Sequence, residues 1–171
     1  MLDVKEFINI LKKQKYNFIL NEHDPVFTVE ESSKLRGKIK GSHSKNLFLK
    51  NKKNNFYLIS CEENELIDLK KISKFLHLGN TSFAKEEYLY KYLAVKPGSV
   101  SPFALLNDTC NVVDFYLEKK LYESEIINFH PLINNITITI ETKKFISFMI
   151  ENNKKIHIFS NQEGVIIKRY E

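Results

Sequence analysis

Several short apolar segments of this 171-residue chain follow one another across tight turns, and this pattern constrains the fold more than any other feature. The clearest pair lies at residues 46–50 and 56–60, with a turn at residues 52–55 between them. Two strands joined by so short a turn run antiparallel, because a parallel connection needs a dozen or more residues. Helical and strand-like segments alternate along the chain. We therefore predict an α+β fold, with a mixed or antiparallel central sheet flanked by helices, rather than a doubly wound parallel sheet.

The spacing of apolar residues predicts the individual elements. Predicted helices cover residues 3–12, 66–78, 82–93 and 142–151. Predicted strands cover residues 16–20, 46–50, 56–60, 103–107, 112–117, 136–140 and 155–159. Thr28 and Glu31 form a capping-box pattern that opens one more helix, while Gly79, Ser82 and Thr142 are expected to act as helix caps. No internal repeat or domain boundary is evident, so we expect residues 1–171 to form a single domain.

The composition excludes several classes of protein. Hydrophobic residues make up 43% of the chain and charged residues 27%, which is ordinary for a globular domain. No apolar run approaches the roughly 18 residues of a membrane span. The N-terminal segment contains Asp3, Glu6 and several lysines, unlike a secretory signal or a transit peptide. We expect a monomeric cytoplasmic protein that does not bind membranes.

The positive charge is concentrated in one segment. The chain carries a formal charge of +5, yet residues 34–53 hold eight basic residues and no acidic one. Such a cluster is typical of a surface that binds phosphate or nucleic acid. A second explanation, a biased coding sequence, remains open. Such a bias would also make nearly all the cations Lys, and it would make Asn and Ile abundant, as they are in this chain.

Familiar catalytic and metal-binding motifs are absent from the sequence. The two cysteines, Cys61 and Cys110, have no CxxC spacing, and the five histidines form no pair at ligand spacing. No phosphate-binding loop, GxGxxG, GxSxG or HExxH motif occurs. We therefore expect no metal, no cofactor and no covalent nucleophile.

Three short segments could carry chemistry. Lys45 and Asn46 lie where a loop enters a strand; Lys can hold a phosphate, and Asn can donate to and accept from a ribose or carbonyl. The loop GSVSP at residues 98–102 can present backbone N–H groups to an oxyanion. His130 precedes a proline, which favours an extended backbone, and can titrate near neutral pH. Each segment also has a purely structural explanation, as a solvated Lys, a rigid connector or a structural His.

In this order and spacing, the segments resemble a known family. KNLFLK, GSVSPFALLND and NFHP, together with HDPVFTVEES and TSFAKEEYL, resemble the YbaK/ProRS-editing-domain superfamily, and more narrowly its free-standing alanyl-tRNA(Pro) deacylase branch, called ProXp-ala or PrdX. The resemblance covers residues 16–148. It implies the fold of that superfamily, with a partly barrel-like sheet. It also implies hydrolysis of the ester that joins alanine to the terminal adenosine of tRNA(Pro). Prolyl-tRNA synthetase makes this ester in error.

The resemblance further implies which residues form the site. Lys45 and Asn46 match the family's Lys-Asn pair, while Gly98 and Pro102 match the ends of its GxxxP loop. In this family a water molecule attacks the ester, assisted by the substrate's own ribose hydroxyl, while the loop backbone holds the aminoacyl carbonyl. The expected catalytic set is Lys45, Asn46, Gly98, Ser99, Val100, Ser101, Pro102 and His130. Additional substrate contacts are expected from Thr28 and Asn128, and tRNA backbone contacts from Lys34, Arg36, Lys38 and Lys40.

The expected partners are tRNA(Pro) mischarged with alanine and, as a second candidate, prolyl-tRNA synthetase. Ile136 replaces a residue that is small in the family, which could tighten the pocket or only repack the core. Two alternatives stay open: a deacylase for Cys-tRNA(Pro) or another small amino acid, and a non-catalytic tRNA-binding module. The tail at residues 152–171 matches nothing in the family pattern and receives no role.

Overall fold

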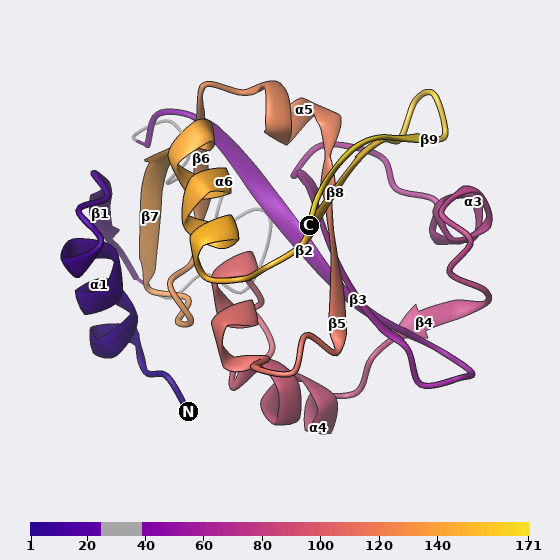
Figure 1. The fold of residues 1–171 in the computed structure, drawn as a ribbon, viewed down its shortest axis with the longest axis horizontal. Coiled ribbons are helices and arrows are strands. Elements are labelled where there is room, and N and C mark those ends of the chain that lie inside the picture. The colour runs from indigo at the N-terminus through magenta and orange to yellow at the C-terminus, as the bar shows by residue number, and fades with distance from the viewer. Residues whose placement is uncertain (25–38) are drawn as a thin grey trace.

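The computed structural model describes residues 1–24 and 39–171 (Figure 1). Thr28, Lys34, Arg36, Lys38 and the helix predicted near Thr28 lie outside these residues. The helical elements are α1 (Val4–Lys13), α3 (Leu69–Phe75), α4 (Glu86–Tyr88), the π-helix η1 (Leu89–Leu93), the 3-10 helix η2 (Pro102–Asn107), α5 (Lys119–Glu123) and α6 (Thr142–Glu151). The strands are β1 (Ile19–Glu22), β2 (Ser42–Asn51), β3 (Phe56–Glu62), β4 (Thr81–Phe83), β5 (Val113–Glu118), β6 (Ile126–Phe129), β7 (Ile136–Glu141), β8 (Ile156–Ser160) and β9 (Val165–Tyr170).

The strands form one mixed sheet in the order β1-β7-β6-β2-β3-β5-β8-β9, with β4 paired to β2. The hairpin of β2 and β3 is antiparallel, whereas β3, β5 and β8 run parallel to one another. Strand β2 also pairs in parallel with β6, but only through its first two residues. The predicted α+β fold with a mixed sheet is therefore confirmed. β2 lies between β6 and β3 in this order, and it carries the candidate residues Lys45 and Asn46.

Two hydrophobic clusters cover the two faces of the sheet. The larger one contains Phe48 and Phe115 from the sheet with Phe7 of α1 and Phe148 of α6. The smaller one contains the alternate strand residues, such as Leu49, packed with α3. Figure 1 shows α6 and α3 at opposite sides of the sheet. This division follows from the period of two along a strand, which sends neighbouring side chains to opposite faces.

Most predicted elements are confirmed, with shifts at their ends. Helix α1 begins as its sequence indicates, because the Asp3 side chain accepts from the backbone N–H of Glu6 and the Glu6 side chain accepts from that of Asp3. The first strand begins at Ile19 rather than at residue 16. A further strand, β9, follows the segment 155–159 that was predicted to be the last.

The strand predicted at residues 103–107 is wrong, since this segment forms the 3-10 helix η2. Ser101 caps the helix by accepting a hydrogen bond from the Phe103 N–H (3.2 Å), and Pro102 supplies a pre-set φ at the first helical position. An apolar run of this length is ambiguous between strand and helix, and the cap decides the outcome.

Three predicted helix caps are also wrong. Helix α3 is shorter than predicted and ends at Phe75, and the left-handed residue that terminates it is His77 (φ 57°). Gly79 also has positive φ (+78°) but lies beyond this helix end. Ser82 lies in strand β4, so the following helix begins only at Glu86. Thr142 is the first residue of α6 instead of its cap, and its hydroxyl donates to the Ser124 carbonyl.

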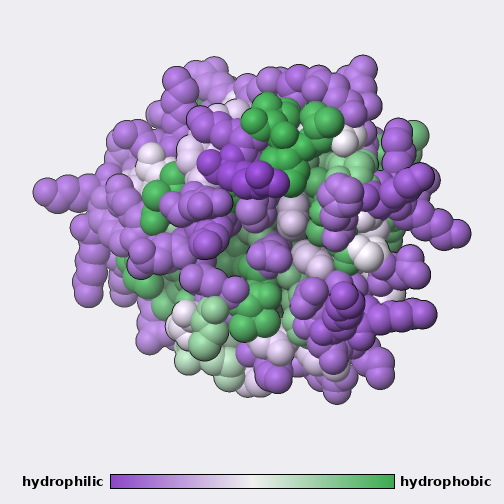
Figure 2. All heavy atoms as spheres, turned by 45° about the vertical axis from the view of Figure 1, so that its right-hand side comes forward, coloured by the Kyte–Doolittle hydropathy of each residue, from purple (hydrophilic) through white to green (hydrophobic). Residues whose placement is uncertain are grey.

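The face drawn in Figure 2 is mainly hydrophilic. Figure 2 shows small, separate apolar patches among polar side chains on the face that comes forward from the right of Figure 1. Exposed apolar residues of the chain include Leu66, Phe83, Val165 and Ile167. Among the described residues, no helix is long and apolar enough to cross a membrane.

Candidate functional site

Alternate residues of β2 place a polar row on the same face as Phe48. Ser60 donates to Asn46 Oδ1 (2.6 Å), the Asn46 amide donates to Ser44 Oγ (3.4 Å), and Ser44 donates to the Asn128 carbonyl (3.0 Å). This row runs from β3 across β2 to the end of β6. It therefore links Asn46 to the segment that carries His130.

Asn128 is a buried residue whose amide is fully engaged. Its Nδ2 donates to the Lys40 carbonyl (2.9 Å) and the Ser42 carbonyl (3.3 Å), and its Oδ1 accepts from the Thr139 hydroxyl (2.6 Å). Thr139 in turn accepts from the Asn21 amide (2.9 Å). These contacts fix the start of β2 against β6 and β7. Asn128 therefore has a structural role beside the polar row.

His130 lies just beyond β6 with its imidazole in a defined state. Its Nδ1 is 2.9 Å from the Ile136 carbonyl, which can only accept, so Nδ1 carries the proton and Nε2 is left as an acceptor. Burial lowers the pKa of His130, the Ile136 hydrogen bond opposes this effect, and nearby His23 and His43 lower the pKa further. The imidazole is therefore neutral near pH 7.

His23 lies beside His130 and was not singled out from the sequence. The two ring centroids are 6.1 Å apart, and the His23 imidazole bonds to the Asp24 carbonyl (2.8 Å) and the Thr137 hydroxyl (2.9 Å). The polar row on β2 was also not predicted from the sequence. Serines at every second position of SHSKN indicate one polar face of a strand, but only the fold shows that Ser60 and Asn128 meet it.

The loop at residues 98–102 approaches the segment that follows His130. Gly98 has φ +86°, and a Cβ at this position would lie 3.7 Å from Asn134 Nδ2. The Ser99 N–H donates to the Lys96 carbonyl (3.0 Å), and Ser99, Ser101 and Pro102 are buried. Among the described residues, the N–H groups of Val100 and Ser101 have no hydrogen-bond partner.

Lys45 points to the opposite face of the sheet from Asn46. Its Nζ donates to the backbone carbonyl of Glu65, in the loop that follows β3. It lies across from Cys61 in the register of β2 and β3. The structure therefore brings Asn46 and Asn128 into one polar network, with His130 two residues beyond Asn128 and hydrogen-bonded separately to Ile136, and it gives Lys45 a different set of protein contacts.

The buried Cys61 is not an activated nucleophile. Burial raises the pKa of the Cys61 thiol to about 12, although nearby Lys45 opposes this effect, so the thiol stays protonated at neutral pH. Cys110 is an exposed free thiol. Among residues 1–24 and 39–171, no cluster of three His, Cys, Asp or Glu side chains could hold a metal ion.

The structure divides the basic segment. Lys40 is exposed next to the start of β2, where its carbonyl accepts from Asn128. Lys50 Nζ lies 4.7 Å from the centre of the Tyr88 ring. Lys52 and Lys53 lie beyond the far end of β2, about 20 Å or more from Lys45 at about 3.3 Å per strand residue. The cations of this segment that the structure describes therefore do not form one compact patch around the site.

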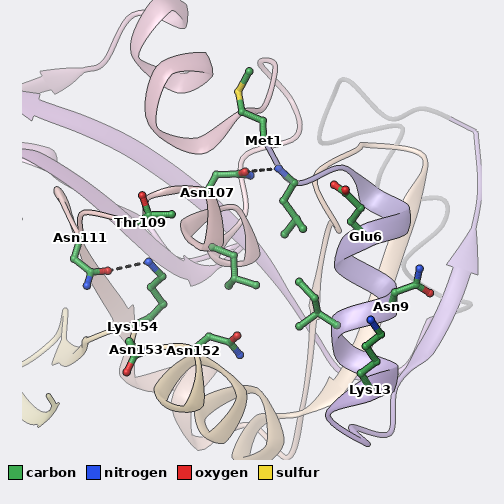
Figure 3. Close-up of a pocket in the computed structure, with 13 residues that line it drawn as sticks. Met1, Glu6, Asn9, Lys13, Asn107, Thr109, Asn111, Asn152, Asn153 and Lys154 are labelled. Atoms are coloured by element: carbon green, nitrogen blue, oxygen red, sulfur yellow. Dashed lines mark hydrogen bonds between the residues drawn. The ribbon is translucent and has the colours of Figure 1, made fainter.

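A separate pocket of about 870 Å³ lies between α1, the end of η2 and the turn after α6 (Figure 3). Several of its polar side chains are engaged with the protein. Asn107 accepts from the backbone N–H of Leu2 (2.7 Å), and Lys154 donates to the Asp108 carbonyl (2.6 Å) and to Asn111 Oδ1 (2.8 Å). None of the residues predicted for the site lines this pocket.

Comparison with known proteins gives a consistent result. Residues 23–148 match the model of the aminoacyl-tRNA editing domain family. The chain is 36% identical, over 81% of its length and 86% of the relative's, to the prolyl-tRNA editing protein ProX of Acetoanaerobium sticklandii. It is 34% identical to prolyl-tRNA synthetase associated domain-containing protein 1 of Xenopus laevis, covering 85% of this chain and 89% of the relative.

A solved structure shares the fold. It is described as a candidate trans-editing enzyme for prolyl tRNA synthetase, and it superposes with a TM-score of 0.67 at 14% sequence identity. The superposition covers 98% of this chain and 99% of the other.

Proposed function

Because this chain belongs to the aminoacyl-tRNA editing domain family, we propose that it hydrolyses the ester of alanine mischarged on tRNA(Pro). Family membership makes the chain an aminoacyl-tRNA deacylase, and relatives named for prolyl-tRNA editing support tRNA(Pro) as the carrier. We also propose that it acts as a cytoplasmic monomer, on tRNA released by prolyl-tRNA synthetase.

The observation that carries the proposal is the approach of the loop at 98–102 to the segment 130–134, which holds a neutral His130. An aminoacyl ester is already activated, so its hydrolysis needs a positioned water and a stabilised oxyanion more than a strong nucleophile. His130 Nε2 accepts a hydrogen bond from the attacking water. The N–H groups of Val100 and Ser101 donate to the oxyanion that forms on the aminoacyl carbonyl.

In this mechanism the water oxygen bonds to the carbonyl carbon, and the ester bond to the ribose oxygen breaks. The adjacent ribose hydroxyl assists by passing the water's proton to the departing oxygen. Asn46 fixes the ribose or the amino group, from a position held by Ser60 and Ser44. Lys45 binds the terminal phosphate, and Lys40 a phosphate of the tRNA backbone.

Selection of alanine over proline is steric in this proposal. Ile136 lies next to His130 through the hydrogen bond of its carbonyl, and its side chain narrows the space available to the amino acid. A small pocket rejects the larger cognate amino acid, which is the logic of a second sieve.

The proposal is tested by deacylation of tRNA(Pro) charged with alanine, cysteine or proline. We expect Ala-tRNA(Pro) to be hydrolysed well above the spontaneous rate and Pro-tRNA(Pro) to stay intact. Preferred hydrolysis of Cys-tRNA(Pro) would show that cysteine, rather than alanine, is the amino acid that the enzyme removes. No hydrolysis of any of the three would overturn the proposed function.

A further inference from the structure

Lys45 is held by the loop that follows β3. The Lys45 ammonium donates to the backbone carbonyl of Glu65, whose neighbours Asn64 and Leu66 are exposed. Leu66 in particular is 90% exposed. The nearest apolar anchor of the loop is Ile67, two residues further on, so polar interactions are left to fix the Glu65 carbonyl that orients Lys45.

Two residues from distant parts of the chain supply these interactions through the Glu65 side chain. Lys120 of α5 forms an ion pair with the Glu65 carboxylate, whose side chain is only 13% exposed. Asn161, in the turn after β8, donates to Glu65 Oε1 (2.9 Å) and to the Leu66 carbonyl (3.2 Å). Hydrogen bonds from Lys120 and Asn161 lower the pKa of Glu65, so the side chain is a carboxylate at neutral pH.

A buried carboxylate, Glu118, holds both of these residues in turn. Glu118 is 2% exposed and accepts from the backbone N–H of Lys120 (2.7 Å) and that of Asn161 (3.5 Å). These residues meet because β3, β5 and β8 are parallel, which brings their carboxyl ends to the same edge of the sheet. This is the edge at which open α/β sheets commonly place ligands.

The arrangement also protects the charge of Lys45. A backbone carbonyl orients an ammonium group without neutralising it, and two of the three ammonium donors remain available for a phosphate. The Glu65 carboxylate would neutralise Lys45 if the two paired directly. Lys120 occupies that carboxylate and leaves the neutral carbonyl for Lys45.

We infer that Lys120 and Asn161 are positioning residues for Lys45: they fix Glu65 so that its carbonyl holds the Lys45 ammonium toward the terminal phosphate of the tRNA. The inference rests on the proposed function and gives the C-terminal segment after β8 a part in the site.

The test measures deacylation of Ala-tRNA(Pro) and binding of uncharged tRNA(Pro) by fluorescence anisotropy. Lys120→Met and Asn161→Ala are compared with Lys119→Met, a matched control whose ammonium pairs with Glu163 (3.1 Å) on the surface. We expect the first two to raise KM and the tRNA Kd about 3- to 10-fold, with kcat and Tm close to those of the control. Lys120→Arg restores binding.

A double-mutant cycle separates positioning from general damage. In a Lys45→Ala background, Lys120→Met should cause no further change in KM or Kd. Two results would overturn the inference while the wild-type chain remained an active deacylase. One is equal KM and Kd for Lys120→Met and Lys119→Met, and the other is an effect of Lys120→Met on KM and Kd that is as large in the Lys45→Ala background as in the wild type. A wild-type chain that binds tRNA without hydrolysing it overturns only the proposed activity. A chain that does neither overturns both.

Discussion

At the scale of single residues, the proposed mechanism depends on the protonation state of His130. A neutral imidazole with its proton on Nδ1 can accept a hydrogen bond from water at Nε2, whereas the protonated form can only donate. Burial and the neighbouring histidines lower the pKa of His130 and so preserve the accepting form. The carbonyl of Ile136 fixes the tautomer.

The activity is therefore expected to fall in acid. Since the pKa of His130 in the folded protein lies below its ordinary value of about 6.5, kcat/KM should stay level at neutral pH and decline only below about pH 6.5. His130→Ala should lower kcat/KM and remove this decline. The exposed His77→Ala is the control and should retain it. The measurement is a profile of kcat/KM from about pH 5 to 8 for the three proteins. A decline that persists in His130→Ala would show that protonation of His130 does not cause it.

The same shift has a consequence for stability. A histidine whose pKa is lowered by folding binds protons more tightly in the unfolded chain, so its contribution is present above about pH 6.5 and is lost as the pH falls. Burial lowers the pKa of His157 in the same direction. The two residues therefore make acid unfolding begin at mildly acidic pH.

At the scale of elements, turns and caps position the donors of the loop at 98–102. Gly98 adopts φ +86°, and the loop then enters η2 through the Ser101 cap. A Cβ at Gly98 would make only ordinary contact with Asn134, so the left-handed backbone and not crowding requires glycine.

Gly98→Ala should therefore strain the loop and displace its N–H groups. We expect a loss of about 1 kcal/mol in stability and a fall of about 10-fold or more in kcat/KM. Gly164→Ala is a matched control, since Gly164 also has positive φ (+69°) and an ordinary Cβ contact, in the turn between β8 and β9. It should lose similar stability but keep its activity. Equal activity of the two variants would argue against the loop as the oxyanion site.

The turn after α6 depends on a buried lysine. Lys154 is 9% exposed, and its ammonium donates to the Asp108 carbonyl and to Asn111 Oδ1. Figure 3 shows the second of these hydrogen bonds. Lys154→Met leaves these acceptors unpaired, so we expect a loss of about 1–3 kcal/mol in the free energy of unfolding. The exposed neighbour Lys155→Met is the control and should change it little. Urea unfolding measures both, and coincident transitions would show that the contact contributes nothing.

At the scale of the whole molecule, the arrangement of charge matters more than the total of +5. The basic residues of β2 and its flanks extend along the strand, so only those near its start lie close to the polar row. Phosphate contacts release counterions, which makes the affinity for tRNA fall with salt in proportion to the number of contacts.

Lys40→Gln should thus weaken tRNA binding and reduce the slope of log Kd against log salt by about 1. Lys53→Gln, at the hairpin far from Asn46, should leave the slope unchanged. Both variants lose one positive charge, so the comparison separates a local contact from the net charge of the protein. Equal slopes for the two variants would indicate nonspecific attraction.

The sequence by itself determined the features that depend on near neighbours. The helix predicted at residues 3–12, the antiparallel hairpin of β2 and β3, and each of the motifs that identify the family lie within short stretches of chain. The segment at 103–107 was misjudged because a short apolar run fits both a strand and a 3-10 helix until its cap is taken into account.

Only the tertiary structure decided which side chains meet. The contact of Asn46 with Ser60 needs the register of a hairpin, and that of Glu65 with Asn161 joins residues 96 positions apart. Such contacts depend on the order and direction of strands, which local propensity does not encode. For the same reason, the fold separated Lys45 from Asn46: they are adjacent in sequence, but a strand directs neighbouring side chains to opposite faces.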